Sequence, residues 1–202
     1  MTAALPLEPR VDVSFALAGT TVPQDHGYAL FGALCRVLGD LHQAKWLAVH
    51  PLFGQPQSDG LLGLNDGRGA LRVRVVRAGI PRILPLAGKR LDIDGHPVVV
   101  GVSRLHTLQP APVVVARIVV IKGFMEETPF AGAIARQLEA LGVNATVEVG
   151  RRRVVTIAGD RAVGFGTRLS GLSDEDSLRV QTAGLGGRQR MGCGVFLPTA
   201  GE

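Results

Sequence analysis

Five histidines, at positions 26, 42, 50, 96 and 106, are the side chains of this sequence best suited to move protons near neutral pH. His96 falls on a predicted hairpin turn and His106 follows the end of a predicted strand, so we expect both at the surface. His50 precedes a proline at a strand end and is expected to be structural. His26 and His42 therefore remain as candidates for acid–base chemistry.

His42 follows a predicted helix over residues 26–38, whose carbonyl end favours a protonated imidazole and so a general acid. Lys45, three residues later, suits the stabilisation of developing negative charge. His26 begins the same helix, where the dipole favours a neutral base; its alternative role is to cap and orient the first turn. A continuous helix at ~1.5 Å per residue would separate the two histidines by roughly 24 Å, so we expect only one at a reacting bond.

A glycine-rich segment near the carboxyl end, residues 184–198, reads Gly-Leu-Gly-Gly-Arg-Gln-Arg-Met-Gly-Cys-Gly-Val-Phe-Leu-Pro. A predicted helix precedes it and a strand follows, which is the reverse of the order in dinucleotide and P-loop sites. Glycines permit close approach to a ligand, and exposed N–H groups between arginines suit a run of RNA phosphates. The alternative is a tight turn whose glycines meet only steric needs. The candidate RNA-binding residues are Gly186, Gly187, Arg188, Arg190, Gly192 and Gly194.

Three consecutive arginines, Arg151, Arg152 and Arg153, fall on a predicted hairpin turn in the second half of the chain. Such a turn suits insertion along an RNA groove or against phosphates. The alternative is an ordinary solvated turn. Lys122 follows a predicted buried strand over 113–121, and we expect it to reach the same surface.

The overall charge agrees with a polyanionic partner without specifying one. The chain of 202 residues has a formal net charge of +5, and 19 of its 22 basic residues are arginine. Arginine binds phosphates in a forked geometry and stacks on bases, although a high-GC genome would produce the same bias. Aromatic residues make up only 4%, which argues against a broad aromatic platform for reading bases.

The two cysteines, Cys35 and Cys193, lie far apart without a Cys-x-x-Cys pair. This spacing excludes a cysteine zinc site and argues against a disulfide scaffold, so we expect a reduced, cytoplasmic protein. No stretch is apolar enough to span a bilayer, and the N-terminus has no signal-peptide pattern. We therefore expect no membrane association.

The order of predicted elements repeats along the chain. The first half is predicted to contain strands at 11–18, 46–50 and 71–76 (the last at an edge or surface), a helix at 26–38, a short helical turn at 81–84, and a hairpin of 90–93 with 97–103. The second half is predicted to contain strands at 113–121, 147–149, 154–157, 161–169 and 195–197, with helices at 128–141 and from Ser173, capped through Asp176, to Gly184. This pattern predicts an α+β fold of two tandem ferredoxin-like (RRM-like, βαββαβ) domains, residues 1–109 and 110–202.

Several of these segments together carry a family resemblance. Residues 22–32 (Val-Pro-Gln-Asp-His-Gly-Tyr-Ala-Leu-Phe-Gly), Leu41-His42-Gln43, Lys45-Trp46-Leu47 and the glycine-rich segment 184–198 resemble the "Cas six" endoribonucleases of the CRISPR repeat-associated (RAMP) superfamily, and within it the myxobacterial-type (Myxan) branch.

The resemblance implies that the chain binds a CRISPR repeat stem-loop RNA and cuts at the 3′ base of the stem. The family's chemistry needs no metal or cofactor: a 2′-OH attacks the adjacent phosphate, leaving a 2′,3′-cyclic phosphate and a 5′-OH. His42 matches the family's catalytic histidine. The family often has a tyrosine where Cys35 stands, and Tyr28 could replace it. The alternatives are a non-catalytic RNA-binding subunit working with other CRISPR effector subunits, and a scaffold that binds no nucleic acid.

Overall fold

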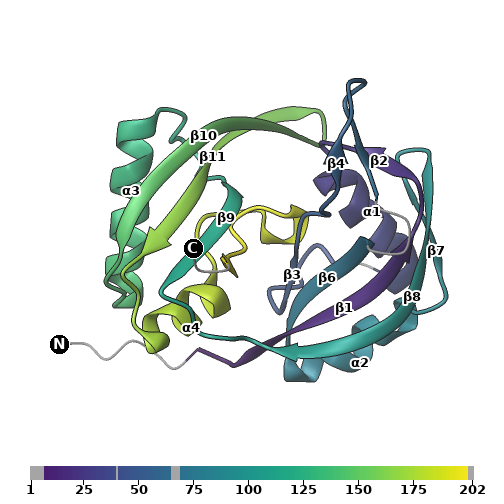
Figure 1. Ribbon diagram of the computed structural model, residues 1–202, viewed down its shortest axis with the longest axis horizontal. Helices are drawn as coiled ribbons and strands as arrows, with labels where there is room; N and C mark the ends of the chain where they lie inside the picture. Colours follow the sequence, from purple (N-terminus) through teal and green to yellow (C-terminus); the bar gives the residue numbers. More distant parts are fainter. Residues whose placement is uncertain (1–6, 40, 65–68, 200–202) are drawn as a thin grey trace. The chain divides into compact units, whose positions relative to one another are not determined.

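The computed structural model describes residues 7–39, 41–64 and 69–199. The chain forms two compact units (Figure 1). The first unit comprises residues 10–107, and the second comprises residues 108–202 together with the first nine. Both contain helices and antiparallel sheets, which confirms the predicted α+β class.

The first unit is built on a five-stranded antiparallel sheet in the order β3-β6-β1-β8-β7. Its strands are β1 (Arg10–Ala18), β3 (Leu47–Val49), β6 (Gly69–Val76), β7 (Arg90–Ile93) and β8 (His96–Thr107). Helix α1 (Gly27–Leu38) connects β1 to β3, and the short helix α2 (Ile80–Ile83), with a 3-10 turn on either side, follows β6. A small three-stranded sheet is formed by β2 (Thr21–Pro23), β5 (Leu61–Gly63) and β4 (Gln55–Pro56). Strand β2 follows β1 in the sequence, and β4 and β5 lie between β3 and β6.

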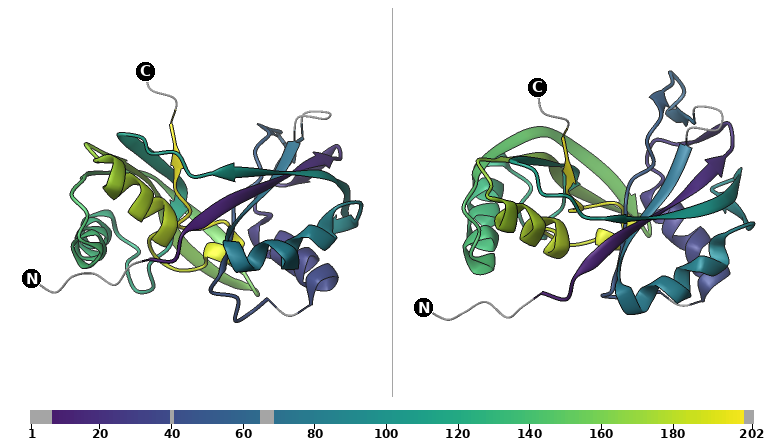
Figure 2. Two further views of the ribbon diagram at one scale, coloured as in Figure 1. Left: turned by 90° about the horizontal axis from the view of Figure 1, so that it is seen from below. Right: turned by 60° about the horizontal axis from the view of Figure 1, so that its bottom comes forward.

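Alternating apolar residues place one face of this sheet against the helices. Val13, Phe15 and Leu17 of β1 are buried, as are Leu30 and Phe31 on α1. Figure 2 shows α1 and α2 on the same side of the sheet. The sequence pattern therefore predicted the bounds of α1 to within one residue, and the expected short second helix is confirmed.

Strand β6 differs from the prediction of an edge or surface strand, which is wrong. It pairs with β1 on one side and with β3 on the other, so it is a central strand. Arg74 in its middle is only 1% exposed. The residue directly opposite on β1 is Asp12, and this carboxylate allows the guanidinium to be buried.

Strand β8 is longer than predicted and continues to Thr107. His106 therefore lies within the strand, where its Nε2 is 2.7 Å from the Ser14 hydroxyl oxygen. His96 is the first residue of the strand and is half-buried, with Nδ1 3.0 Å from the Thr21 hydroxyl oxygen. Strand β7 pairs with β8 only as far as Val99, and no described strand covers the outer edge of residues 101–106.

The second unit has a four-stranded antiparallel sheet in the order β10-β11-β9-β12. Its elements are β9 (Val113–Val119), α3 (Glu127–Leu141), β10 (Thr146–Ile157), β11 (Asp160–Ser170), α4 (Asp174–Ala183), a 3-10 turn (Gln189–Met191) and β12 (Leu197–Pro198). In Figure 1 the helix α3 lies along β10 and β11. Phe130 of α3 packs on Phe165 of β11, with ring centroids 4.8 Å apart.

The helix ends of this unit follow the predicted capping signals. The Ser173 hydroxyl accepts a hydrogen bond from the Asp176 backbone N–H at 3.1 Å, at the start of α4. Helix α4 ends before Gly184, and α3 ends before Gly142, which has the left-handed backbone that glycine tolerates. Both predicted helices are confirmed.

The predicted basic turn at residues 150–153 is wrong. Strand β10 runs through this segment, and its register with β11 shifts between Val149 and Arg152. A β-bulge thus accommodates one extra residue without ending the strand. The reversal occurs later, at Ala158–Gly159, where both residues have positive φ. The last strand is also shorter and later than the predicted 195–197.

Candidate functional site

His42 lies on a tight double turn between α1 and β3. Helix α1 ends before Gly39, which has a φ of 82°. Two backbone hydrogen bonds define the double turn: Ala44 N–H donates to Leu41 O at 3.0 Å, and Leu47 N–H donates to Ala44 O at 3.2 Å. The His42 side chain is exposed, and its ring meets that of Phe31 edge-on with centroids 5.3 Å apart.

The contact with Phe31 shows that the chain doubles back along α1. Phe31 is only five residues after His26, so the roughly 24 Å expected for a continuous helix does not apply. Tyr28 precedes Phe31 by three residues, and residues three apart on a helix are neighbours. Tyr28 is 41% exposed, whereas Phe31 is only 1% exposed. Cys35 is half-buried one turn after Phe31.

Lys45 is exposed on the same turn as His42. Its carbonyl oxygen accepts a hydrogen bond from the Arg10 guanidinium at 2.7 Å. This bond fixes the end of the turn to the start of β1. The structure thus brings an imidazole and an ammonium group onto one short, anchored segment, and a phenol onto the adjacent helix.

His26 is placed differently. It is 1% exposed, and both ring nitrogens are hydrogen-bonded to backbone groups. Nδ1–H donates to Pro23 O at 2.9 Å, and Nε2 accepts from Leu52 N–H at 2.9 Å. This pair of bonds selects the neutral tautomer that carries its proton on Nδ1. His26 makes no side-chain cap bond to α1, so it orients the chain entering the helix by joining it to the segment after β3.

A buried ionic cluster that sequence reasoning missed lies on the first sheet. Asp12 binds Arg74 through two oxygens, at 2.7 and 3.0 Å, and His50 Nε2 is 3.4 Å from the same carboxylate. Burial favours the neutral acid, but hydrogen bonds from His50 and Arg74 hold the pKa of Asp12 well below its usual range. Burial also lowers the pKa of His50, against the attraction of Asp12. The signal in the sequence was an acidic residue, Asp12, in one apolar strand and arginines, Arg72 and Arg74, in another.

The glycine-rich segment is folded onto its own unit. Gly186 N–H donates to Gln137 Oε1, Gly187 N–H donates to Val120 O and Gly194 N–H donates to Ile118 O, each at 2.8 Å. These N–H groups are therefore already occupied by α3 and by the end of β9. The expectation that they meet phosphates is wrong for these three glycines.

Steric requirements explain the glycines. A Cβ at Gly186 would lie 2.5 Å from Val120 O, and one at Gly194 would lie 1.9 Å from Leu185 O. Gly192 has a φ of 82°. The backbone approaches its own chain closely, as the alternative interpretation of the segment required.

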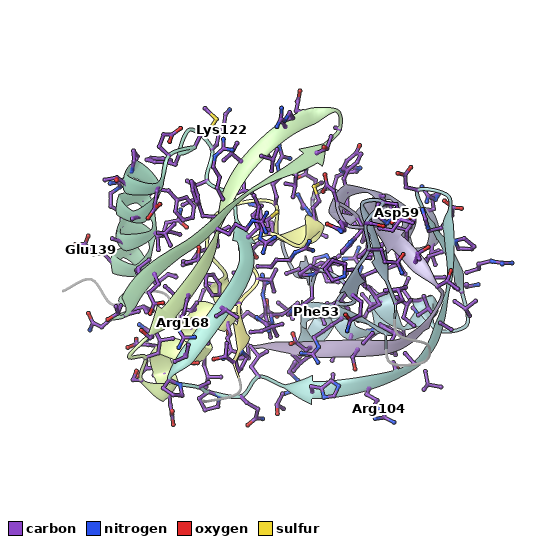
Figure 3. The ribbon with its side chains drawn as sticks, turned by 45° about the horizontal axis from the view of Figure 1, so that its top comes forward. Phe53, Asp59, Arg104, Lys122, Glu139 and Arg168 are labelled. Atoms are coloured by element: carbon purple, nitrogen blue, oxygen red, sulfur yellow. The ribbon has the colours of Figure 1, made fainter. Side chains whose placement is uncertain are left out.

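The two arginines of this segment differ in exposure. Arg188 is exposed and has a left-handed backbone, with φ 62° and ψ 29°, which is uncommon for a residue other than glycine. Arg190 is half-buried. Lys122 is exposed two residues after Val120, the residue that binds Gly187, and is labelled in Figure 3. The structure thus brings Lys122 and the glycine-rich segment to one part of the second unit.

The three arginines of β10 do not form one cluster. Successive strand residues point to opposite faces, so Arg152 and Arg153 diverge. Arg151 and Arg152 are exposed, whereas Arg153 is half-buried and its Nε has no hydrogen-bond partner among the described residues. The predicted insertion of all three from one turn is therefore not possible.

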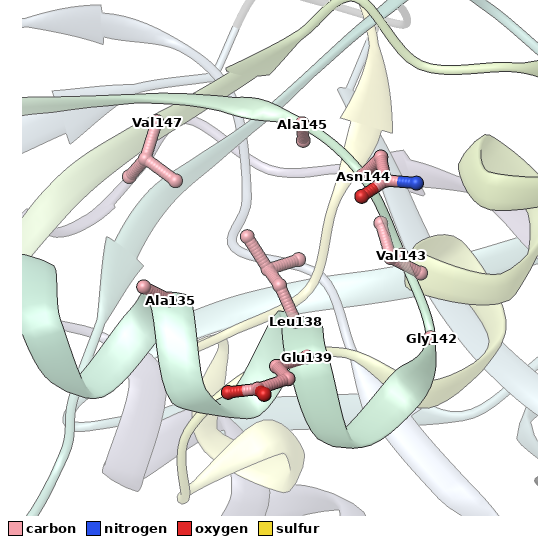
Figure 4. Close-up of a pocket in the computed structure, with 8 residues that line it drawn as sticks. All are labelled: Ala135, Leu138, Glu139, Gly142, Val143, Asn144, Ala145 and Val147. Atoms are coloured by element: carbon pink, nitrogen blue, oxygen red, sulfur yellow. The ribbon is translucent and has the colours of Figure 1, made fainter. Parts of the chain in front are cut away.

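A pocket of about 430 Å³ opens between the end of α3 and the start of β10 (Figure 4). Glu139 is its only charged lining residue, and none of the candidate histidines or arginines reaches it. An acidic, open hollow is poorly suited to bind phosphate, so we assign it no part in the site. Within the described residues, no group of three or more His, Cys, Asp or Glu side chains is placed to hold a metal. No described helix is long and apolar enough to cross a membrane.

Comparison with known proteins decides the family. The family model described as Cas6 Crispr matches residues 11–201. The chain belongs to the Cas6 family. A curated relative, the CRISPR-associated endonuclease Cas6 of Myxococcus xanthus, is 47% identical over 188 residues, covering 93% of this chain and 81% of that protein. The predicted membership of this family is thus confirmed.

Solved structures support the fold of this Cas6 chain. A CRISPR-associated protein Cas6 matches with a TM-score of 0.68 and 14% identity, over 95% of this chain and all of that one. A RAMP protein described as binding different RNA substrates matches with a TM-score of 0.61 and 14% identity, over 92% of this chain and 98% of that one. At these identities the likeness concerns the fold alone.

Proposed function

We propose that this Cas6 chain is a metal-independent endoribonuclease that binds CRISPR repeat stem-loop RNA and cleaves pre-crRNA at the 3′ base of the stem. The observation that carries the proposal is the exposed His42, held against α1 on an anchored turn that also presents Lys45. The family membership supplies the substrate class.

In the proposed reaction the 2′-oxygen attacks the adjacent phosphorus, and the bond from phosphorus to the 5′-oxygen breaks. A base takes the 2′-OH proton and an acid returns a proton to the 5′-oxygen, so the products are a 2′,3′-cyclic phosphate and a 5′-OH. His42 is the proposed acid, Lys45 stabilises the charge on the phosphorane, and Tyr28 is the polar partner on the adjacent helix. His26 is a positioning residue, because using either nitrogen as a base would break a bond that holds the chain.

The second unit is proposed to bind the stem. Arg188, Arg190 and Lys122 supply charges beside the glycine-rich segment, and Arg151, Arg152 and Arg153 add charge along β10. Gly186, Gly187, Gly192 and Gly194 act through the backbone shape they permit. Both units are proposed to be ferredoxin-like domains, since the strand orders β3-β6-β1-β8 and β10-β11-β9-β12 both fit the βαββαβ pattern.

The decisive experiment is cleavage of the repeat RNA encoded beside this gene, in EDTA. Substitution of the 2′-OH at the cut site by hydrogen should stop the reaction. His42→Ala should lower the single-turnover rate by about 10²–10⁴-fold while leaving RNA affinity unchanged. His106→Ala, which removes another exposed histidine of the same unit, is the matched control and should cut normally.

Other outcomes are equally informative. A rate lost with His26→Ala but kept with His42→Ala, in a variant that remains folded, would reverse the assignment. Tight repeat binding without cleavage under any condition would indicate instead a non-catalytic RAMP subunit that works with other CRISPR effector proteins.

A further inference from the structure

The single tryptophan of the chain lies at the end of the His42 turn, and it forms a specific pair with an arginine. The Arg82 guanidinium carbon is 4.4 Å from the centroid of the Trp46 ring. The indole is only half-buried, and Arg82 on α2 is exposed. Such cation–π contacts hold a long arginine side chain in one orientation while leaving its donors free for a ligand.

The fold makes room for this pair. Gly79, one helical turn before Arg82, lies so close to the indole that a Cβ there would be 2.5 Å from Trp46 Cε3. The Trp46 carbonyl also accepts a hydrogen bond from Val76 N–H at 3.2 Å, which joins it to the end of β6. The Trp46 backbone is therefore held to β6, and the missing side chain at Gly79 leaves room for the indole ring.

Positive charge is concentrated at this point. Lys45 immediately precedes Trp46, and Arg10 binds the Lys45 carbonyl. Across the residues that the structure describes, neither Lys45 nor Arg82 forms a salt bridge with a carboxylate. A half-buried indole that follows Lys45 in the sequence and stacks against Arg82 has the composition of a single-stranded nucleic-acid contact, in which a base stacks and phosphates meet the charges.

We infer that Trp46 and Arg82, with Lys45, form a binding site for an unpaired nucleotide next to the cleaved linkage. The inference rests on the proposed function, because the nucleotide belongs to the same RNA. His42 and Trp46 are four residues apart, so their Cα atoms lie within about 14 Å even for an extended chain, and the two turns shorten this span. A nucleotide held at Trp46 is therefore only a short stretch of RNA away from the imidazole.

Trp46 reports on this site directly, because its emission is the only tryptophan signal of the protein. The probe is the repeat RNA with a 2′-deoxy substitution at the cut site, so that binding is measured without cleavage. Full-length RNA should change the Trp46 emission, whereas the isolated stem-loop, trimmed of its unpaired flanks, should bind with little change. Equal changes with both RNAs, or none with either at saturation, would overturn the inference.

Substitutions separate this site from the chemistry. Arg82→Ala should weaken binding of the flanked RNA by about 10-fold and that of the trimmed stem-loop by less than 2-fold, and should reduce the salt dependence of log Kd by about one charge. Arg90→Ala, which removes an exposed arginine of β7, is the matched control and should leave both affinities unchanged. Arg82→Lys should recover part of the loss.

The two proposals fail in different ways. If RNA is cut normally but Arg82→Ala binds flanked and trimmed RNAs like the parent protein, the nucleotide site is wrong and the endoribonuclease stands. If no RNA is cut while Trp46 emission still responds to the unpaired flank, the nucleotide site stands and the catalytic proposal fails.

Discussion

The His42 turn and the glycine-rich segment look alike in sequence, since each is a short loop that carries basic residues after a helix. They differ in which groups the fold leaves available. In the glycine-rich segment, the backbone N–H groups of three glycines are bound to α3 and to the end of β9, so these groups cannot bind a ligand. On the His42 turn the backbone closes on itself in two turns, which leaves His42 and Lys45 exposed and Trp46 half-buried. A glycine-rich loop can thus serve to pack the chain closely on itself, and a loop without special composition can carry the catalytic residues.

The largest expected effect tests whether the glycines of this segment are needed for close packing of the chain on itself. Gly194→Ala should lower the free energy of unfolding by more than about 3 kcal/mol, because its Cβ would meet Leu185 O at 1.9 Å and its φ is 68°. Gly171→Ala is the matched control: φ is 72° but no atom lies within 4 Å. It should cost only about 1–2 kcal/mol. Urea unfolding followed by circular dichroism measures the free energy of unfolding of both variants. Equal losses would contradict a special need for close packing at Gly194.

A second effect concerns the sheet that carries the His42 turn. Burial lowers the pKa of His50, so as pH falls below about 6.5 the unfolded chain binds a proton that the folded chain does not. Stability should therefore fall from pH 7 to pH 5, by at most about 1.4 kcal/mol per pH unit from this group. The pKa of Asp12 is also lowered, so below about pH 4 this carboxyl binds a proton in the unfolded chain but not in the folded chain, and further stability is lost.

Trp46 emission in urea follows this pH dependence in the first unit. His50→Gln, which keeps a hydrogen-bond donor near Asp12, should flatten the slope between pH 7 and pH 5. His106→Gln removes an exposed histidine and should leave it unchanged. A slope that His50→Gln does not alter would show that another group is responsible.

The smallest effect separates backbone from side chain at Arg188. Glycine adopts the left-handed backbone of this position without strain, whereas alanine, like arginine, is destabilised there by about 1 kcal/mol. Arg188→Gly and Arg188→Ala should therefore weaken repeat RNA binding equally, by about 3- to 10-fold, while the alanine variant is the less stable of the two. Filter binding and thermal unfolding measure these quantities. If both variants bind the RNA with the affinity of the parent protein, Arg188 does not contribute to RNA binding.

Much of the fold could be predicted because its signals are local. The cap at Ser173, the glycine after α3 and the alternation in β1 are each set by neighbours in the sequence. The central position of β6 could not be predicted, since it depends on Asp12, more than sixty residues away, pairing with Arg74. Strand β10 was predicted as two short strands separated by a turn, because a bulge allows one strand to pass through Gly150.

The candidate site divides in the same way. Residue types marked His42 and Lys45, but they did not show that the chain folds back to Phe31. A glycine-rich pattern alone does not show whether the glycines allow close approach to a ligand or to the protein's own backbone. His26 was ambiguous for the same reason, because its two partners, Pro23 and Leu52, lie on segments that only the folded chain brings together.

The open edge of β8 has a practical consequence. Val102 is 72% exposed and Leu105 is 59% exposed on a segment that no described strand covers. An uncovered strand of this kind recruits extended chains and promotes aggregation, and the charge of Arg104 (Figure 3) opposes this. Concentrated samples should therefore stay monodisperse longer when Val102 is replaced by lysine, a change remote in sequence from every residue assigned to the site.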